Sequence, residues 1–220
     1  MKIAIILAEF GKPAPDVSQY RECWPDADIQ VFSDADVQRI PQFEGPRYGW
    51  RMNDYWTVRK ALDSGADVAM CFDGDMRIVD QNAAQELPRL ARRFGICLPI
   101  NPRYTVRKDF TDGADTGACI DQTIWNAPSF NCSPVAIGLG GSPPERGGRL
   151  MAEMYCEFLL RTPERGPLAW WRAMEYCGVA PLALPPQWCV CEKHIGIGNE
   201  IILHEGHDAV KRHYAAHRSS

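Results

Sequence analysis

Histidine is absent from the first 193 residues of this chain, and all five histidines lie in its C-terminal end. Apolar runs approaching the roughly 20 residues needed to span a bilayer are also absent, which excludes a transmembrane helix. Excess charge of one sign is small, because the net charge is −4 and charged residues make up 24% of the 220 residues. This balance excludes a disordered chain and a strongly basic nucleic-acid-binding protein. No internal repeat or low-complexity tract is evident.

Glycine-rich phosphate-binding motifs are missing after the first apolar run. Residues 8–12, Ala-Glu-Phe-Gly-Lys, have neither the Walker A spacing nor the GxGxxG pattern. This absence disfavours P-loop enzymes and dinucleotide-dependent oxidoreductases. The apolar run of residues 3–8 is too short for a signal peptide, and Glu9 interrupts it. We therefore expect a soluble cytoplasmic protein.

The nine cysteines are an odd number, spread from Cys23 to Cys191. A disulfide scaffold would be shorter and denser in cysteine, so we expect reduced thiols. Cys177, Cys189, Cys191 and His194 lack the spacing of a standard structural zinc site, and alternate residues on a strand point to opposite faces. Buried thiols are the preferred interpretation.

Apolar periodicity predicts strands that alternate with helices. The expected strands span residues 3–8, 29–32, 68–72, 96–100, 135–138, 179–184 and 188–191, and the expected helices span residues 51–64, 82–94, 150–160 and 168–176. Residues 101–128 lack periodicity and predict a long irregular excursion, and residues 140–148 predict a loop. This order favours an α/β sandwich with a mostly parallel central sheet. We expect one domain, residues 1–220, in which residues 1–100 form a nucleotide-binding half and residues 101–220 an acceptor half.

The most informative motif is Asp73-Gly74-Asp75, directly after the apolar run of residues 68–72. Two carboxylates separated by one glycine can both face a hard divalent cation, and Mg²⁺ or Mn²⁺ prefers oxygen ligands. The alternative is a polar turn in which the aspartates cap the next element. The position after a buried strand favours the metal interpretation, because ligands of open α/β sheets bind beyond the carboxyl ends of the strands.

At this point the chain resembles the GT-A nucleotide-sugar glycosyltransferases. The resemblance rests on the N-terminal strand, on Asp34 after the second strand and on the Asp-x-Asp motif. Residues 201–211 are similar to the closing His-x-x-Gly-x-x-Lys element of the glycogenin and lipopolysaccharide galactosyltransferase group. Residues 129–135 fall where that group carries an Asn-rich strand lining the sugar pocket. The chain departs from the pattern in that Gly206 follows His204 by two residues. Residues 166–171, Gly-Pro-Leu-Ala-Trp-Trp, also occupy the region where that group carries an Asp-Gln pair before a helix.

The resemblance implies a three-layer GT-A fold and a set of site residues. Mn²⁺ or Mg²⁺ would be held by Asp73, Asp75 and His204, with His207 as a second candidate ligand. Lys211 and Arg51 would contact the diphosphate of the donor, and Asp34 would contact its base or ribose. Because residues 166–171 carry no Asp-Gln pair, the catalytic or sugar-contacting carboxylate is expected among three residues, Asp112, Asp115 and Asp121.

These features predict a metal-dependent glycosyltransferase that uses a nucleotide-diphospho-sugar, with a UDP-sugar favoured. A nucleotidyltransferase of related fold and a catalytically silent nucleotide-sugar or glycan-binding module are the alternatives. The acceptor stays open between a glycan, a protein, a small molecule and a modified nucleic-acid base, as does the choice between retention and inversion. The tryptophans are interpreted as core and surface residues first and as sugar-stacking platforms second, a comparison that covers Trp50, Trp125, Trp170, Trp171 and Trp188.

Overall fold

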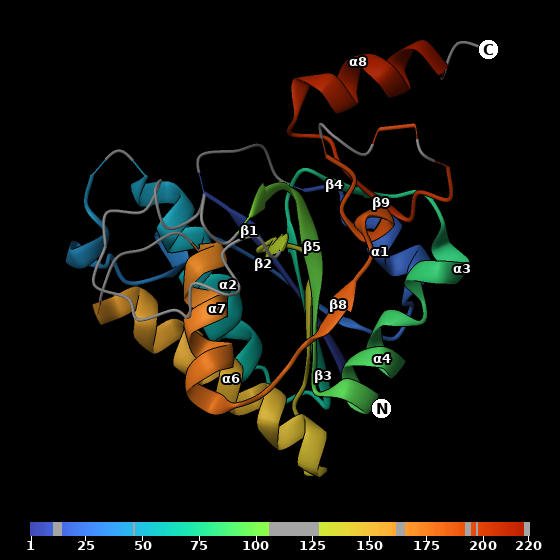
Figure 1. The fold of residues 1–220 in the computed structure, drawn as a ribbon. Helices are drawn as coiled ribbons and strands as arrows, with labels where there is room; N and C mark the ends of the chain where they lie inside the picture. Colours follow the sequence, from blue (N-terminus) through green and yellow to red (C-terminus); the bar gives the residue numbers. More distant parts are fainter. Residues whose placement is uncertain are drawn as a thin grey trace.

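The computed structural model describes residues 1–10, 15–45, 47–105, 128–161, 166–191, 195–196 and 198–217. Its centre is a seven-stranded mixed sheet in the order β2-β1-β3-β7-β5-β6, with β8 paired to β5 (Figure 1). The strands are β1 (Ile3–Glu9), β2 (Asp28–Ser33), β3 (Val68–Asp73), β5 (Ile96–Thr105), β6 (Pro128–Phe130), β7 (Val135–Gly138) and β8 (Leu182–Leu184). A separate small sheet pairs β4 (Met76–Ile78) with β9 (Ile202–His204).

The strand directions explain why the sheet is mixed rather than purely parallel. β1 pairs in parallel with β2 and β3, whereas β7 lies antiparallel between β3 and β5. β6 is antiparallel to β5, and β8 is parallel to it. Strands β2, β1, β3, β5 and β8 therefore run in the same direction, whereas β6 and β7 run in the opposite one. The predicted α/β fold with a mostly parallel central sheet is confirmed.

Helices cover both faces of this sheet and make the three layers seen in Figure 1. One face packs against α2 (Tyr48–Asp63), α6 (Pro143–Arg161) and α7 (Gly166–Cys177), and the other against α1 (Ser18–Cys23), α3 (Gln81–Ala84) and α4 (Leu87–Phe94). Helix α8 (Asp208–His217) follows the small sheet, and short 3₁₀ turns occur at η1 (Asp34–Asp36), η2 (Pro41–Phe43) and η4 (Pro186–Trp188).

Side-chain alternation along β1 and β3 divides the core into these two layers. Ile6 and Cys71 belong to the cluster under α2, α6 and α7, whereas Leu7 and Phe72 belong to the opposite cluster. Successive residues of a strand point to opposite faces, so a strand covered on both sides is apolar throughout. The continuous apolar runs in the sequence are explained by this two-sided burial.

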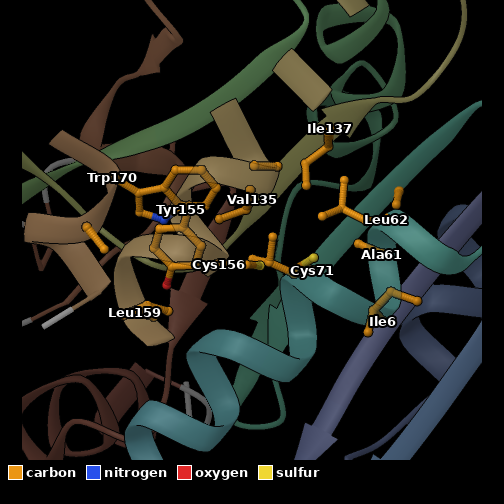
Figure 2. Packing of buried hydrophobic residues seen from close by; sticks show 14 of the residues in the cluster. Ile6, Ala61, Leu62, Cys71, Val135, Ile137, Tyr155, Cys156, Leu159 and Trp170 are labelled. Carbon is orange, nitrogen blue, oxygen red and sulfur yellow. The ribbon is translucent and has the colours of Figure 1, made fainter. Parts of the chain in front are cut away.

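The first of these clusters is closed by an aromatic stack between helices α6 and α7. The rings of Tyr155 and Trp170 lie 3.8 Å apart with an interplanar angle of 14°, and both side chains are buried (Figure 2). Figure 2 shows Cys71, Val135 and Leu159 in the same cluster. The stack fixes α7, whose first residue lies at the pocket described below.

Several predicted boundaries are wrong for local reasons. The helix expected over residues 82–94 is divided into α3 and α4, because Pro88 lacks an N–H and its ring would clash with the carbonyl four residues earlier. α6 begins at Pro143, within the predicted loop of residues 140–148, since proline is suited to the first helical turn. The strand expected over residues 188–191 is a 3₁₀ turn followed by a single bridge from Val190 to Leu203.

Candidate metal and donor site

The Asp-x-Asp motif occupies the turn between β3 and β4. Asp73 is the last residue of β3, and its backbone N–H donates to the hydroxyl of buried Ser133, 2.8 Å away. The Asn53 side-chain amide donates to Asp73 Oδ1 at 3.2 Å. Gly74 lies so close to β1 that a Cβ there would be 3.2 Å from the Ala8 carbonyl oxygen. These contacts hold the Asp73 carboxylate at the carboxyl edge of the sheet.

Pairing of β4 with β9 brings the C-terminal histidine to this turn. Met76 lies opposite His204 in the antiparallel ladder, and the backbone N–H of Glu205 donates to the Asp75 carbonyl at 2.8 Å. Arg77 and Glu205 form an ion pair of 2.5 Å across the same two segments. The ladder therefore fixes His204 beside Asp75 with backbone hydrogen bonds rather than through side chains alone.

Asp73, Asp75 and His204 form a compact donor set. His204 Nε2 lies 3.2 Å from Asp75 Oδ1 and 3.6 Å from Asp73 Oδ2, and one ligand atom from each residue lies within 4.8 Å of the others. Two carboxylate oxygens and one imidazole nitrogen are common protein ligands of divalent cations. The residues present therefore fit a divalent cation, as the sequence predicts.

His207 adjoins this set without belonging to it among the described residues. Its ring is 4.7 Å from the ring of His204 and nearly perpendicular to it. Its backbone N–H donates to the His204 carbonyl at 3.3 Å, within the turn that precedes α8. His207 lines the adjacent pocket. The structure thus places it beside the cluster, and its role as a ligand stays a prediction.

A pocket of about 490 Å³ lies next to the donor set of Asp73, Asp75 and His204, called the metal cluster below. It is lined by Asp73, Gly74 and His204 and by residues of α2. Arg47, just before α2, and Trp50, Arg51 and Asp54 within it are spaced by three or four residues, so they share one face of the helix. The rest of the lining comes from the end of β1, from β5, from the segment after β6 and from the start of α7. The lining residues include Phe10, Arg47, Trp50, Arg51, Asn53, Asp54, Asn101, Asn131, Cys132, Gly166 and His207.

Two arginines, Arg47 and Arg51, line this pocket side by side. Burial lowers the pKa of Arg51, and the positive charge of Arg47 lowers it further. Both effects disfavour the charged guanidinium in the ligand-free pocket. A bound anion would reverse the second effect, so the pair favours a negatively charged ligand near the metal cluster.

Asp34 and Lys211, two further predicted site residues, lie away from the pocket. Asp34 is exposed in η1 and does not line the pocket, while Ser33 and Asp36 form the capping box of that turn. The Lys211 side chain is 59% exposed on α8, 4.0 Å from Asp208, and also does not line it. Asp112, Asp115 and Asp121, like His194, lie outside the described residues. The structure brings together Arg51, Asp73, Asp75, His204 and His207.

The prediction about Cys189 and Cys191 is confirmed in burial but wrong in geometry. Both thiols are buried, and neither is part of a disulfide. A hydrogen bond with Cys191, together with burial, raises the pKa of Cys189 well above its ordinary value. The two side chains meet because a 3₁₀ turn ends at Trp188, so the segment lacks the alternation of a strand. Neither thiol joins a metal-binding group in the described part of the chain.

Sequence reasoning missed Arg47, Asn53 and Asp54 and treated Trp50 as one of several tryptophans. A signal was present, since residues 47, 50, 51 and 54 follow the i, i+3, i+4, i+7 spacing of one helix face. The face is polar, however, and a polar helix face is ordinarily solvated. Only the packing of α2 beside β3 shows that this one faces a pocket.

No protein-family model matches the sequence, and no curated protein matches it. Among solved structures, a glycosyltransferase involved in the glycosylation of the major capsid of PBCV-1 matches with a TM-score of 0.58 and 9% identity. The match covers 99% of this chain and 100% of the other. It shows an α/β fold like that of the GT-A glycosyltransferases, with a mixed central sheet.

Two further structural matches are weaker. Mouse xyloside xylosyltransferase 1 in its apo form has a TM-score of 0.46 and 12% identity, over 91% of this chain and 84% of the other. The Thermus thermophilus 2-C-methyl-D-erythritol 4-phosphate cytidylyltransferase has a TM-score of 0.43 and 11% identity, over 84% and 89%. Within the described residues, the helices are too short or too polar to cross a bilayer.

Proposed function

We propose that this protein is a metal-dependent glycosyltransferase that takes its sugar from a nucleotide-diphospho-sugar, with a UDP-sugar favoured. The observation that carries the proposal is the cluster of Asp73, Asp75 and His204 beside a pocket lined by two arginines. Carboxylates and an imidazole bind the cation, and guanidinium groups bind phosphate oxygens. A diphosphate is the ligand that uses both halves of this site.

Asp73, Asp75 and His204 would hold Mn²⁺ or Mg²⁺, which when bound supplies positive charge for the leaving diphosphate. In the transfer, the bond between the anomeric carbon and the diphosphate oxygen breaks, and its electron pair stays on that oxygen. The acceptor hydroxyl oxygen bonds to the anomeric carbon, and its proton passes to a base. Arg47 and Arg51 would stabilise the charge that develops on the diphosphate.

The finer assignments belong to the same proposal. Asp34 would contact the base or ribose, Lys211 the diphosphate and His207 the cation. The carboxylate that serves as base or contacts the sugar is proposed among Asp112, Asp115 and Asp121. Residues 1–100 would form the nucleotide-binding half and residues 101–220 the acceptor half. The described cysteines are reduced rather than paired in disulfides, which supports a reducing, cytoplasmic location.

The test is incubation of the purified protein with a panel of UDP- and GDP-sugars, with and without Mn²⁺, while release of the free sugar is measured. We expect metal-dependent hydrolysis of at least one donor. Pyrophosphate exchange would indicate a nucleotidyltransferase instead, and saturable binding without turnover would indicate a silent binding module. Either outcome would overturn the proposal.

A matched pair of variants connects the activity to the cluster. Asp75→Asn removes one carboxylate charge from the metal site and is expected to abolish metal-dependent turnover while the protein stays folded. Asp63→Asn removes a carboxylate from the same protein at a surface ion pair with Arg59 and is expected to keep full activity. Full turnover in Asp75→Asn would contradict the role of the cluster.

A further inference from the structure

The outer part of the pocket carries an aromatic side chain that the metal and donor site does not use. Trp50 lines the pocket and is 69% exposed, whereas the other tryptophans that the structure describes are buried or half-buried. Exposure of an indole costs the free energy that its burial would contribute. A ligand that covers the ring recovers this free energy, so the exposed indole at the pocket favours a ligand with an apolar face.

A carboxylate stands one helical turn from this indole. Asp54 follows Trp50 by four residues on the same face of α2 and lines the same pocket. Four residues correspond to a rise of about 6 Å along the helix, which is comparable to the width of one sugar ring. One ligand of that size can therefore contact both side chains.

Asp54 lies beside the start of α7 and near the hydroxyl of buried Tyr155. Gly166 begins α7, and a Cβ there would lie 2.5 Å from Asp54 Oδ2 and 2.9 Å from the Tyr155 hydroxyl. Burial, and next the charge of Asp54, raise the pKa of Tyr155 well above its ordinary value, so this hydroxyl keeps its proton. The absence of a side chain at Gly166 leaves room for the Asp54 carboxylate and the Tyr155 hydroxyl to lie close together.

The charge of Asp54 separates this part of the pocket from the diphosphate part. A carboxylate repels phosphate and accepts hydrogen bonds from hydroxyl groups. The pocket lining also includes Asn101 and Asn131, whose side-chain amides can both donate and accept hydrogen bonds. An apolar surface, a carboxylate and two amides together suit a neutral ligand with one C–H face and several hydroxyl groups.

We propose that Trp50 and Asp54 form the acceptor subsite and that the acceptor is a neutral carbohydrate whose ring stacks on Trp50. Its hydroxyl groups donate to Asp54. This assignment rests on the proposed function, since it takes the metal cluster and the arginines as the donor site. It narrows the acceptor to a glycan or a glycosylated molecule.

The test uses the full-length protein with Mn²⁺ and methyl glycosides of glucose, galactose and mannose as probes. Glycoside binding is followed by saturation-transfer difference NMR in the presence of UDP, and UDP affinity is measured separately by calorimetry. We expect wild-type protein to bind at least one glycoside, with saturation strongest at the ring C–H protons. Trp50→Ala and Asp54→Asn should each lower the ratio of glycoside affinity to UDP affinity at least about tenfold.

Tyr176→Ala is the matched control, because Tyr176 is 70% exposed and does not line the pocket. It should change neither affinity. If Asp54→Asn unfolds, the surface variant Trp50→Ala still decides the result, and Trp50→Phe should restore part of the glycoside binding.

Three results would overturn the acceptor assignment: no glycoside bound by the wild type, an equal fall in both affinities in Trp50→Ala, or binding of p-nitrophenol in preference to every glycoside. The second would place Trp50 in the donor site, and the third would indicate a planar aromatic acceptor. Glycoside binding that depends on Trp50, without any Mn²⁺-dependent binding of UDP, would overturn the proposed transferase and leave the carbohydrate subsite standing.

Discussion

His204 Nε2 lies 3.2 Å from Asp75 Oδ1, although the two residues belong to opposite halves of the chain. The contact exists because His204 pairs with Met76 in the short β4–β9 ladder. A C-terminal segment of three strand residues thereby completes a site that begins at the end of β3. Cation affinity should therefore depend on the C-terminal segment as well as on the two aspartates.

Replacement of His204 tests this dependence directly. His204→Ala removes a nitrogen ligand but leaves both carboxylates, so we expect Mn²⁺ affinity to fall by about ten- to a hundredfold. Calorimetric titration with Mn²⁺ measures the change. His213→Ala is the control, since His213 lies on α8 against the Tyr214 ring and does not line the pocket. Equal affinities in the two variants would exclude His204 as a ligand.

The glycine after Glu205 provides a second test that alters no ligand. A Cβ on Gly206 would overlap the Asp75 carboxylate. Gly206→Ala should displace that carboxylate and lower Mn²⁺ affinity at least about tenfold, since ligand orientation controls affinity. Gly141→Ala should have no effect on binding, because no atom lies within 4 Å of its new Cβ. Unchanged metal binding in Gly206→Ala would show that the turn adapts freely.

The pH dependence of stability should include a contribution from Glu145. The residue is 2% exposed, and a hydrogen bond from Ser142, supported by Arg92, lowers the pKa of its carboxyl below the usual 4.5. A carboxyl with a lowered pKa in the folded state stabilises the protein above its unfolded-state pKa, and this contribution is lost as the pH falls through the folded-state pKa.

Urea unfolding of Glu145→Gln at pH 7 and pH 4 measures this contribution. The variant should lose about 1–3 kcal/mol of unfolding free energy at pH 7 and show a smaller difference between the two pH values than the wild type. Glu153→Gln removes a surface pair with Arg149 and should change stability by at most about 1 kcal/mol. An identical pH dependence in wild type and Glu145→Gln would rule out this contribution.

The stack of Tyr155 on Trp170 should dominate the stability of the layer formed by α6 and α7. Trp170 is fully buried, so Trp170→Ala creates a cavity and should lower the free energy of unfolding by about 3–5 kcal/mol. Exposed Tyr176 on the same helix should cost less than about 1 kcal/mol when replaced by Ala. Urea titrations compare the two, and similar losses would mean that α7 contributes little through this stack.

Much of the central sheet was predictable because its strands are buried on both faces. β1 and β3 appear in the sequence as continuous apolar runs, and the run over residues 68–72 ends at Asp73 as the structure has it. Helix boundaries were less predictable where proline acts in two ways. Pro88 interrupts a predicted helix, whereas Pro143 begins α6 inside a predicted loop.

The sequence by itself determined the order of strands and helices and the adjacency of Asp73 and Asp75, since both follow from local residue patterns. The tertiary structure decided which distant residues join them. β4 and β9 have three residues each, too few to show a strand period, and their pairing depends on long-range packing. The same holds for α2, whose polar face becomes a pocket wall with Trp50 and Asp54 only when the helix packs beside β3. Local patterns report which faces are apolar, but only the assembled fold determines which polar side chains meet.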